Sequence, residues 1–541
     1  MLISRVTIAN HSRIADLDLE IRGHAVIVGA NDVGKTSILR LLDLLLGSTT
    51  GQLYQRLTLA DLADSSAELV VEAVLAGFSD EERRLFPREI SIDSSDRSES
   101  LRVRMTAAVD PDDAEAVTIR RWFPEAGHDR SPSREQIAAF GWRFLPATRG
   151  TAAAALDGER SALHVLLKAI DLGAETGELA GLLEDFNAKL GASERVTGLR
   201  SKVASHLSKA MPRAVAQDDI SLRTASDPQE DVLGGVSMFF ERGGRHVPVA
   251  EQSDGLRQLM SMTLFDLAEG AANVVAVDEP ELHLHPASQR TVAELFGSAG
   301  NQKILVTHSP YIVQPFEPSQ VIAVSPAGTC HQIPDGKLTA VEKERASWWS
   351  PRLLEVLAAC YAIVVEGVSD RIIVEAAARV MGISLDRIGA VVFDVDGAQN
   401  FPHVYKLIGK NGFCVKILGL VDEAEKLVWH GAIGGKPAAV FGTTLWASNL
   451  DLEAEYCRAL TGPGTARALI TAGFCREDGI VSSCGAPGIG QITDDAAAAF
   501  CRKDKIGAAR AIATQLDLAT AEKITSVHGL LQKLRALGEA R

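Results

Sequence analysis

The chain has 541 residues, of which 46% are hydrophobic and 23% charged, and its formal net charge is −15 at pH 7. This length and apolar content exclude a disordered or fibrous chain, and we expect two to four domains with separate cores. The acidic balance excludes nucleic-acid binding through overall charge, because phosphates are neutralised by lysine and arginine; a nucleic-acid surface must therefore be a local patch.

The first twenty residues alternate apolar and polar side chains, which predicts an edge strand rather than the continuous apolar core of a signal peptide. No apolar run reaches the roughly 18 residues of a membrane-spanning helix. The 7 cysteines are scattered without a C-x-x-C pair, which does not favour a disulfide framework. We therefore expect a cytoplasmic protein with no membrane partner.

A glycine-rich octapeptide, GANDVGKT, occupies residues 29–36. It fits the pattern G-x-x-x-x-G-K-[ST], in which backbone N–H groups close around phosphates, the lysine neutralises them and the hydroxyl binds Mg²⁺. The flanking segments 24–28 and 37–46 read as a strand and a helix, the setting that this chemistry requires. The predicted ATP-binding residues are Asn31, Gly34, Lys35, Thr36 and Ser37, with Thr36 also on Mg²⁺.

A second segment, NVVAVDEPELHLHP at 273–286, supplies acids for the same site. Its four apolar residues read as a buried strand that ends at Asp278 and Glu279. Asp278 would contact Mg²⁺, and Glu279 would position the attacking water. We interpret the following loop as structural, with a metal site as the alternative, because no further ligand follows at zinc-like spacing; its candidate ligands are Glu281, His283 and His285.

Two further segments complete the ATPase pattern. EQSDGLRQ at 251–258 resembles the signature motif of ABC ATPases, and Ser253 and Gly255 at a helix start would bind a γ-phosphate. A strand at 303–306 leads to His308, which resembles the switch histidine of the same class. An ordinary helix cap and a satisfied strand-end histidine are the respective alternatives. In ABC ATPases the signature of one subunit caps the nucleotide of the other, so the resemblance implies a head-to-head dimer.

The long separation between the glycine-rich loop and its acids indicates an ATPase head split by an insertion. We assign residues 1–160 to the first half of the head, 161–215 to a helical insertion, and 216–345 to the second half. The insertion is too short for a long coiled coil, so we expect a compact arm or a dimerisation element. A polar stretch from 328 to 351 reads as a linker.

Two clusters of basic residues are candidate contacts with nucleic acid, and a solvated helix face is the alternative for each. One lies in the insertion and consists of Arg195, Arg200, Lys202 and Lys209. The other lies near the C-terminus and consists of Arg502, Lys503, Lys505 and Arg510.

Past the linker, three apolar runs alternate with helical segments, at 361–365, 391–393 and 415–421. Each run is followed by acids, which are Glu366 and Asp370, then Asp394 and Asp396, then Asp422, Glu423 and Glu425. Parallel strands present their carboxyl ends at one edge of a sheet. We therefore expect a small parallel sheet with a Mg²⁺ site at that edge.

The EGVSD motif at 366–370, with a later strand that has an acidic end, resembles the Toprim domain. An ABC-type head followed by Toprim resembles the overcoming-lysogenization-defect (OLD) nucleases, whose relatives include the nuclease subunit of the Gabija phage-defence system. The resemblance covers nearly the whole chain. It implies an α/β protein with an SMC/RecF-like ATPase head, a Toprim domain at 355–470 and a helical segment at 471–541 that completes the Toprim site.

The resemblance also implies metal-dependent DNA cleavage and the residues that would carry it. Glu366 and Asp370 match the first acidic motif and Asp422 the first acid of the D-x-D motif, as ligands for Mg²⁺, with Mn²⁺ or Ca²⁺ as alternatives. Ala424 stands where the second acid belongs. We expect a neighbouring acid to replace it, either Glu425, which we prefer, or Glu423. The remaining alternative is that Asp394 and Asp396, after the previous strand, form the D-x-D pair.

Family nucleases also carry a lysine after the Toprim core, and RKDKIGAA at 502–509 resembles that segment. Lys505 would then stabilise the charge that develops on the phosphate in the transition state. A surface lysine is the alternative. Glu453 resembles a further acidic position of the family.

The leading hypothesis is an ATP-regulated, Mg²⁺-dependent DNA endonuclease in bacterial anti-phage defence. The alternative is an ATP-driven DNA-binding or sensing platform with an inactive Toprim domain, which Ala424 favours. A topoisomerase-like or primase-like enzyme is a third hypothesis, but no tyrosine domain or zinc module is evident. The expected partners are DNA and a second copy of the chain, joined through the heads or the insertion, with a higher oligomer and a helicase-like or other defence protein as further candidates.

Overall fold

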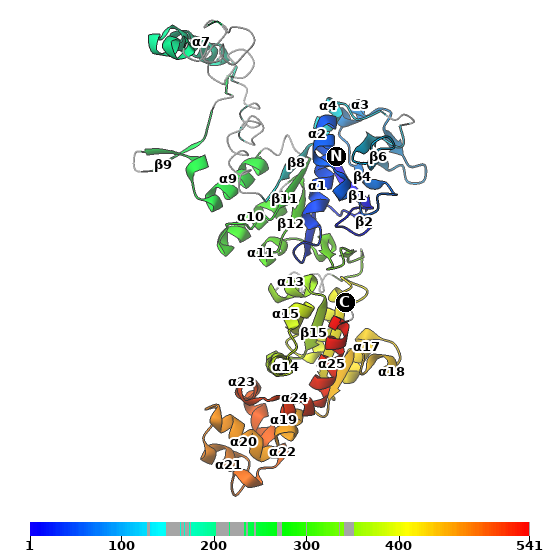
Figure 1. Ribbon diagram of the computed structural model, residues 1–541, viewed down its shortest axis with the longest axis vertical. Helices are drawn as coiled ribbons and strands as arrows, with labels where there is room; N and C mark the ends of the chain where they lie inside the picture. The colour runs from blue at the N-terminus through cyan, green and yellow to red at the C-terminus, as the bar shows by residue number, and fades with distance from the viewer. Residues whose placement is uncertain are drawn as a thin grey trace. The chain divides into compact units, whose positions relative to one another are not determined.

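The computed structural model forms two compact units, Met1–Ala139 with Lys303–Arg541, and Phe140–Gln302 (Figure 1). It describes residues 1–126, 130–147, 163, 167, 172–173, 175–201, 216, 232–233, 236–242, 245–267, 273–298, 300–334, 336–339 and 351–539. The predicted insertion and linker therefore lie only partly within the described residues, and Lys202 and Lys209 lie outside them. No helix in the described ranges is long and apolar enough to cross a membrane.

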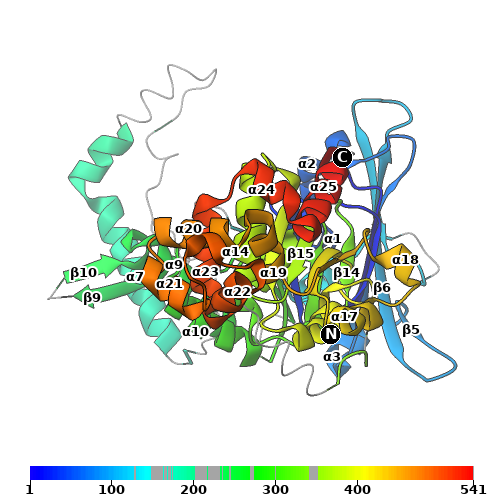
Figure 2. The ribbon, with the colours of Figure 1, turned by 90° about the horizontal axis from the view of Figure 1, so that it is seen from below.

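The first unit begins with an antiparallel sheet in the order β2-β1-β4-β6-β5, in which β7 also pairs with β6. Its strands are Leu2–Ala9 (β1), Leu17–Glu20 (β2), Leu69–Ala76 (β4), Ile90–Ile92 (β5), Glu99–Val109 (β6) and Val117–Trp122 (β7). Figure 2 shows β6 as one of the long strands of this sheet. The prediction of an edge strand at the N-terminus is wrong, because β1 lies between β2 and β4; alternation reports a buried face and not the absence of a neighbour.

A second set of strands in this unit carries the glycine-rich loop. β3 (Ala25–Gly29) pairs in parallel with β12 (Gln302–Val306) and β13 (Val321–Val324), and β14 (Cys330–Gln332) is antiparallel to β13. The residues of β3, β12 and β13 are all buried, as expected for strands inside a parallel sheet. β14 falls inside the segment predicted as a linker, so that prediction is wrong at its N-terminal end.

The helices of this part are short except for the one that follows the glycine-rich loop. They are Lys35–Leu46 (α1), Thr50–Arg56 (α2), Asp80–Leu85 (α3), Arg134–Ala139 (α4) and Pro310–Val313 (α11).

The second unit contains a parallel pair of strands, a hairpin and three described helices of at least 13 residues. β8 (Trp142–Leu145) pairs with β11 (Val274–Asp278), and β9 (Phe239–Arg242) pairs with β10 (Arg245–Pro248). The helices are Glu175–Ala192 (α7), Asp254–Leu267 (α9) and Pro286–Ser298 (α10). α7 lies in the region predicted to be helical.

The first unit continues into a four-stranded parallel sheet in the order β16-β15-β17-β18. The strands are Tyr361–Val365 (β15), Ala390–Asp394 (β16), Lys416–Asp422 (β17) and Leu445–Ser448 (β18). The three predicted strands and their parallel pairing are confirmed. β18 was not predicted, because four residues with a central tryptophan and a terminal serine give no clear apolar run.

Helices cover both faces of this sheet. α14 (Val368–Val380) and α25 (Thr525–Glu539) contact each other, α14 packs on β15 and β16, and α25 packs on β17 and β18. On β17, Leu418 and Leu420 join this core, so Gly419 between them faces the other side. A Cβ on Gly419 would lie 3.2 Å from the ring of Trp429, which places α17 (Lys426–Ile433) on the opposite face.

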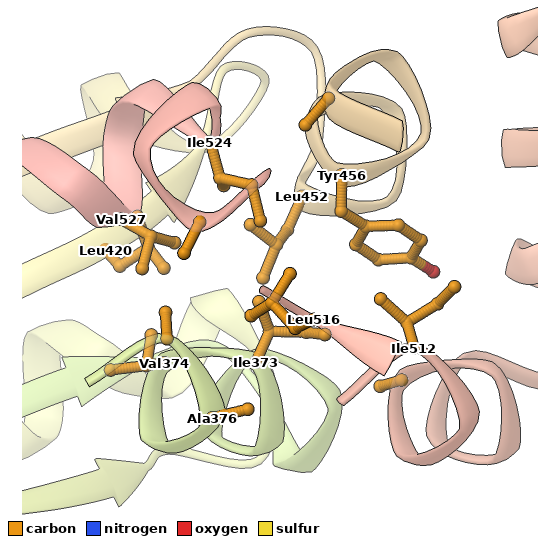
Figure 3. Packing of buried hydrophobic residues seen from close by; sticks show 14 of the residues in the cluster. Ile373, Val374, Ala376, Leu420, Leu452, Tyr456, Ile512, Leu516, Ile524 and Val527 are labelled. Atoms are coloured by element: carbon orange, nitrogen blue, oxygen red, sulfur yellow. The ribbon is translucent and has the colours of Figure 1, made fainter. Parts of the chain in front are cut away.

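Between β18 and α25 the chain passes through a group of helices that shares the same core. Figure 3 shows Leu452, Tyr456, Ile512 and Leu516 packed towards Ile373 of α14. The predicted boundary between 470 and 471 coincides with the end of α20, inside this group of helices. The remaining helices are Pro351–Ala358 (α13), Leu385–Ile388 (α15), Phe401–Ile408 (α16), Pro437–Val440 (α18), Leu452–Leu460 (α19), Gly462–Thr471 (α20), Glu477–Ser483 (α21), Asp494–Cys501 (α22), Lys505–Gln515 (α23) and Leu518–Lys523 (α24).

Candidate functional sites

The glycine-rich loop has the strand-to-helix geometry that the sequence predicts. It joins β3 to α1, and Gly34 has φ 92°, where a Cβ would lie 2.6 Å from the carbonyl oxygen of Arg13. Lys35 is 5% exposed, and its Nζ donates to the carbonyl oxygens of Gly29 at 3.2 Å and Ala30 at 2.5 Å. A buried ammonium at the start of a helix, inside a tight loop, suits a phosphate.

The other predicted residues of this loop lie around that lysine. Thr36 and Ser37 are in the first turn of α1, and Asn31 is exposed at the tip of the loop. In the same unit, His308 is exposed two residues beyond the end of β12, and the neighbouring Ser309 caps α11 through the backbone N–H of Tyr311 at 3.2 Å.

The predicted acidic half of the nucleotide site belongs to the second unit. Asp278 ends β11 and is 3% exposed, and Glu279 follows it with φ 51°. A non-glycine residue in the left-handed region is uncommon, and such strain concentrates at functional sites. The loop and the acids lie in different compact units, so their joint nucleotide site stays a prediction.

The signature-like segment lies beside the loop after these acids. Gly255 is in the first turn of α9, and a Cβ there would lie 2.5 Å from the carbonyl oxygen of His283. Ser253 immediately precedes α9, and its carbonyl oxygen accepts from the N–H of Arg257 at 3.0 Å. The Nδ1 of His285 accepts from the N–H of Ala287 at 3.4 Å, at the start of α10, which agrees with a structural loop rather than a metal site.

The second candidate site lies at the carboxyl edge of the β16-β15-β17-β18 sheet. Glu366 follows β15, and its Oε1 accepts from the backbone N–H of Asp422 at the end of β17, at 2.7 Å. Asp370 lies in the first turn of α14, and its Oδ2 accepts from the N–H of Gly367 at 2.9 Å. The Oδ1 of Asp422 accepts from the hydroxyl of Ser448 at 2.8 Å. The structure therefore brings the three predicted acids together.

The charges of these carboxylates act on one another. Burial, together with Asp422 and Glu425, raises the pKa of Glu366 to about 7. Burial and the charges of Asp422, Glu453 and Glu366 raise the pKa of Asp370 to about 8. Burial also raises the pKa of Asp422. Like charges in a partly desolvated pocket oppose each other's ionisation, and a cation placed among them relieves that opposition.

A lysine faces the acids from the helical part. The Nζ of Lys505 lies 3.1 Å from the Oε2 of Glu453, whose side chain is 2% exposed. Burial lowers the pKa of Lys505, but Glu453, Asp422 and Asp370 outweigh that effect and raise it above its ordinary value. Glu453 and Lys505, which the sequence links only weakly to the site, therefore lie within its electrostatic field.

The acids around Ala424 differ in their surroundings. Glu423 is exposed and forms a surface ion pair with Lys426. Glu425 is half-buried at the start of α17, its Oε2 accepts from Gln399 at 2.9 Å, and its charge contributes to the raised pKa of Glu366. Glu425 thus faces the site and Glu423 faces solvent, which supports our preference for Glu425.

The alternative pair on β16 has a structural partner. The carboxylate of Asp394 is in contact with Arg352 of α13 and lies 3.6 Å from Arg371 of α14. Asp396 is exposed in a turn with φ 56°, followed by Gly397, whose N–H donates to the carbonyl oxygen of Glu366 at 2.9 Å. Asp394 is therefore part of an ion-pair cluster. Asp396 belongs to a turn that supports the end of β15 through the bond from Gly397.

The sequence did not indicate two further contributors. The hydroxyl of Ser448 orients Asp422, and Arg502 donates to both oxygens of Asp451 at 2.7 and 2.9 Å. Ser448 ends a strand that the sequence did not reveal, and no local signal marks it. Arg502 was predicted only as part of a basic cluster, and the structure pairs it with Asp451; its contact with nucleic acid stays a prediction.

The donor chemistry fits a hard divalent cation, because the acids offer only oxygens and repel each other. Among the described residues, however, no group of three or more acidic, histidine or cysteine side chains is arranged to hold an ion as it stands.

Two protein families match this chain, one in its N-terminal part and one in its C-terminal part. A family described as "AAA domain, putative AbiEii toxin, Type IV TA system" matches residues 25–314. The chain belongs to this ATPase family. A second family, "Overcoming lysogenization defect protein-like, TOPRIM domain", matches residues 358–423. The predicted fusion of an ATPase to an OLD-like Toprim domain is thereby confirmed, and the relation to the Gabija subunit stays a prediction.

Several solved structures are similar to parts of the chain. The C-terminal region of the Burkholderia pseudomallei OLD protein is 19% identical and covers 33% of this chain and 98% of its own, with a TM-score of 0.28. The equivalent region of the Xanthomonas campestris pv. campestris OLD protein is 20% identical and covers 34% and 97%, with a TM-score of 0.28.

The SMC head domain from Thermotoga maritima is 10% identical and covers 62% of this chain and 99% of its own, with a TM-score of 0.30. No curated protein matches this chain.

Proposed function

We propose that this protein is an ATP-regulated, divalent-metal-dependent DNA endonuclease. The observation that supports this most is the convergence of Glu366, Asp370 and Asp422 at one sheet edge, with raised pKa values and a lysine opposite. Burial opposes the ionisation of these acids, and a bound cation would offset that cost. Perturbed, partly buried acids of this kind concentrate at functional sites.

The side chains have distinct tasks in phosphodiester hydrolysis. Mg²⁺ or Mn²⁺, when bound, would supply the positive charge that activates water and neutralises the phosphate. Glu366, Asp370, Asp422 and Glu425 would be the ligands. Asp422 is oriented by Ser448, and Glu366 by the backbone of β17, so each presents its remaining oxygen lone pairs in a fixed direction.

Lys505 would face the phosphate from the other side. Its ammonium is paired with Glu453 and half-exposed, so it can contact a substrate oxygen while remaining held. A fixed cation beside the phosphate stabilises the charge that grows in the transition state.

ATP would act through the other half of the molecule. Lys35 would bind the phosphates, Thr36 and Asp278 would hold Mg²⁺, and Glu279 would position water. His308 would respond to the γ-phosphate, and the partner copy would add its signature residues, Ser253 and Gly255. We propose a homodimer, formed through the heads or the insertion, whose state depends on nucleotide.

The proposed biological role is based on the OLD-like Toprim domain. We propose that the substrate is DNA in the bacterial cytoplasm and that the role is anti-phage defence, alone or with a helicase-like or other defence protein. Ala424 supports one alternative, in which the Toprim domain has lost catalysis and the protein is an ATP-driven DNA-binding platform.

Supercoiled plasmid separates these two functions. The wild-type protein is incubated with Mg²⁺ or Mn²⁺, with and without ATP, beside Glu366→Gln and Lys35→Ala. We expect nicking by the wild type, loss of nicking in Glu366→Gln with ATP hydrolysis intact, and loss of hydrolysis in Lys35→Ala. ATP hydrolysis without nicking under any metal condition would establish the platform and reject the nuclease.

A further inference from the structure

Leu450 combines a strained backbone with an exposed apolar side chain. Its φ is 83°, and the residue is 55% exposed. A branched, non-glycine residue in the left-handed region costs about 1–2 kcal/mol. A glycine or asparagine would adopt this conformation more readily. The exposed side chain contributes little packing to offset the cost, so stability does not explain a leucine here.

The fold holds Leu450 in this conformation from several directions. Its carbonyl oxygen accepts from the N–H of Glu423 at 3.2 Å. On one side, the N–H of Asn449 donates to Glu455 at 2.7 Å; on the other, Asp451 caps α19 and pairs with Arg502. The surrounding hydrogen bonds thus hold Leu450 in its strained backbone conformation. Residues held in this way cluster at functional sites.

This residue stands at the rim of the acidic site. Ser448, two residues earlier, lies opposite Asp422 in the sheet and donates to it, and Glu453, three residues later, pairs with Lys505. Two more exposed apolar residues also lie within two positions of site residues in sequence, and they are Leu427 at 71% exposure and Ile506 at 42%.

We infer that Leu450 is a wedge that enters the stack of bases beside the scissile phosphate of duplex DNA. The inference rests on the proposed nuclease function and defines its substrate class as paired DNA that is opened locally at the cut. Proteins that insert leucine or similar apolar side chains between base steps pay a few kcal/mol per step for unstacking. A backbone that is already fixed lowers that cost, because less conformational entropy is lost on insertion than from a mobile loop.

If Leu450 is a wedge, its removal should impair cleavage of fully paired DNA but not of DNA that is already open. Leu450→Gly removes the side chain and relieves the left-handed strain, so the variant should fold with an unchanged or higher Tm. On a short fully paired duplex we expect cleavage with Mg²⁺ to fall about tenfold or more, in line with the cost of unstacking one step. On the same duplex with a mismatched bubble at the cut site, the rate should stay within about twofold, because those bases are already unstacked.

Two matched variants control this comparison. Leu450→Met keeps a long apolar side chain and should retain most duplex cleavage. Leu518→Ala removes an equally exposed leucine at the start of α24, 49% exposed, and should leave both substrates unaffected. In a Glu366→Gln background, 2-aminopurine at the cut site should brighten on binding, and Leu450→Gly should abolish that signal.

The outcomes separate the inference from the function on which it rests. If the wild type cleaves neither substrate, the proposed nuclease function fails. If the wild type cleaves both and Leu450→Gly lowers both equally, or lowers neither, the wedge is rejected while the nuclease stands.

Discussion

The carboxyl edge of the Toprim sheet contains two acidic regions that look alike in sequence and differ in charge balance. At β16, Asp394 is in contact with Arg352 and near Arg371, so its charge is compensated within the fold. At β15 and β17, Glu366 and Asp422 face other acids, and their pKa values are raised. An acid after a strand is therefore a candidate metal ligand only when no basic side chain of the fold compensates its charge.

The largest expected effect tests which region is functional. Asp422→Asn removes one negative charge from the acidic site, and we expect plasmid nicking to fall at least about a hundredfold. Asp394→Asn should keep nicking near the wild-type level but lower stability by about 1–3 kcal/mol, since two arginines lose their charge partner. Nicking rates and denaturant unfolding measure the two effects. If Asp394→Asn abolishes nicking while Asp422→Asn does not, the assignment of the functional acids to β15 and β17 is wrong.

An intermediate effect concerns pH and stability. Asp370 has an ordinary pKa of 3.8 when unfolded and about 8 in the fold, so between these values the folded state binds more protons than the unfolded state. Stability without added metal should therefore fall as pH rises through this window. Asp370→Asn should remove much of this dependence and raise Tm at pH 8 by about 2–4 °C.

Thermal melts from pH 5 to pH 9, with and without Mg²⁺, provide the control. Mg²⁺ should stabilise the wild type more at pH 8 than at pH 5, because cation binding competes with protons for the carboxylates. A melting temperature that is independent of pH in the metal-free protein would show that the acids do not oppose one another.

The smallest effect distinguishes the two acids beside Ala424. Glu425→Gln should raise the Mg²⁺ concentration needed for half-maximal nicking several-fold, because this side chain faces Glu366. Glu423→Gln, its matched control, should change it less than about twofold, as expected for an exposed surface ion pair. The reverse order would assign the replacement ligand to Glu423.

The sequence predicts the sheet strands well where apolar runs are continuous. β15, β16 and β17 carry such runs, and the acids that follow them are visible because parallel strands end at one edge. β18 is too short and mixed to be recognised, so Ser448 and its bond to Asp422 could not be predicted. At the N-terminus, alternation correctly indicates a strand but cannot reveal that β1 has neighbours on both sides.

The roles of charged residues are harder to predict than their positions, because they depend on partners that are distant in sequence. Asp394 and Asp422 have similar local contexts, and only the fold shows that Arg352 and Arg371 approach the first. Glu453 and Lys505 lie 52 positions apart and meet through the packing of α19 against neighbouring helices. The family resemblance indicates both residues, whereas the contact between them emerges only from the structure.

The helices between β18 and α25 are anchored to the sheet at both ends, since α25 returns to β17 and β18. A single break in the backbone near Gly485, between α21 and α22, would therefore leave Glu453 attached through β18 and Lys505 attached through α25. The two fragments would remain associated through their shared core, so limited proteolysis there would nick the polypeptide without dismantling the acidic site.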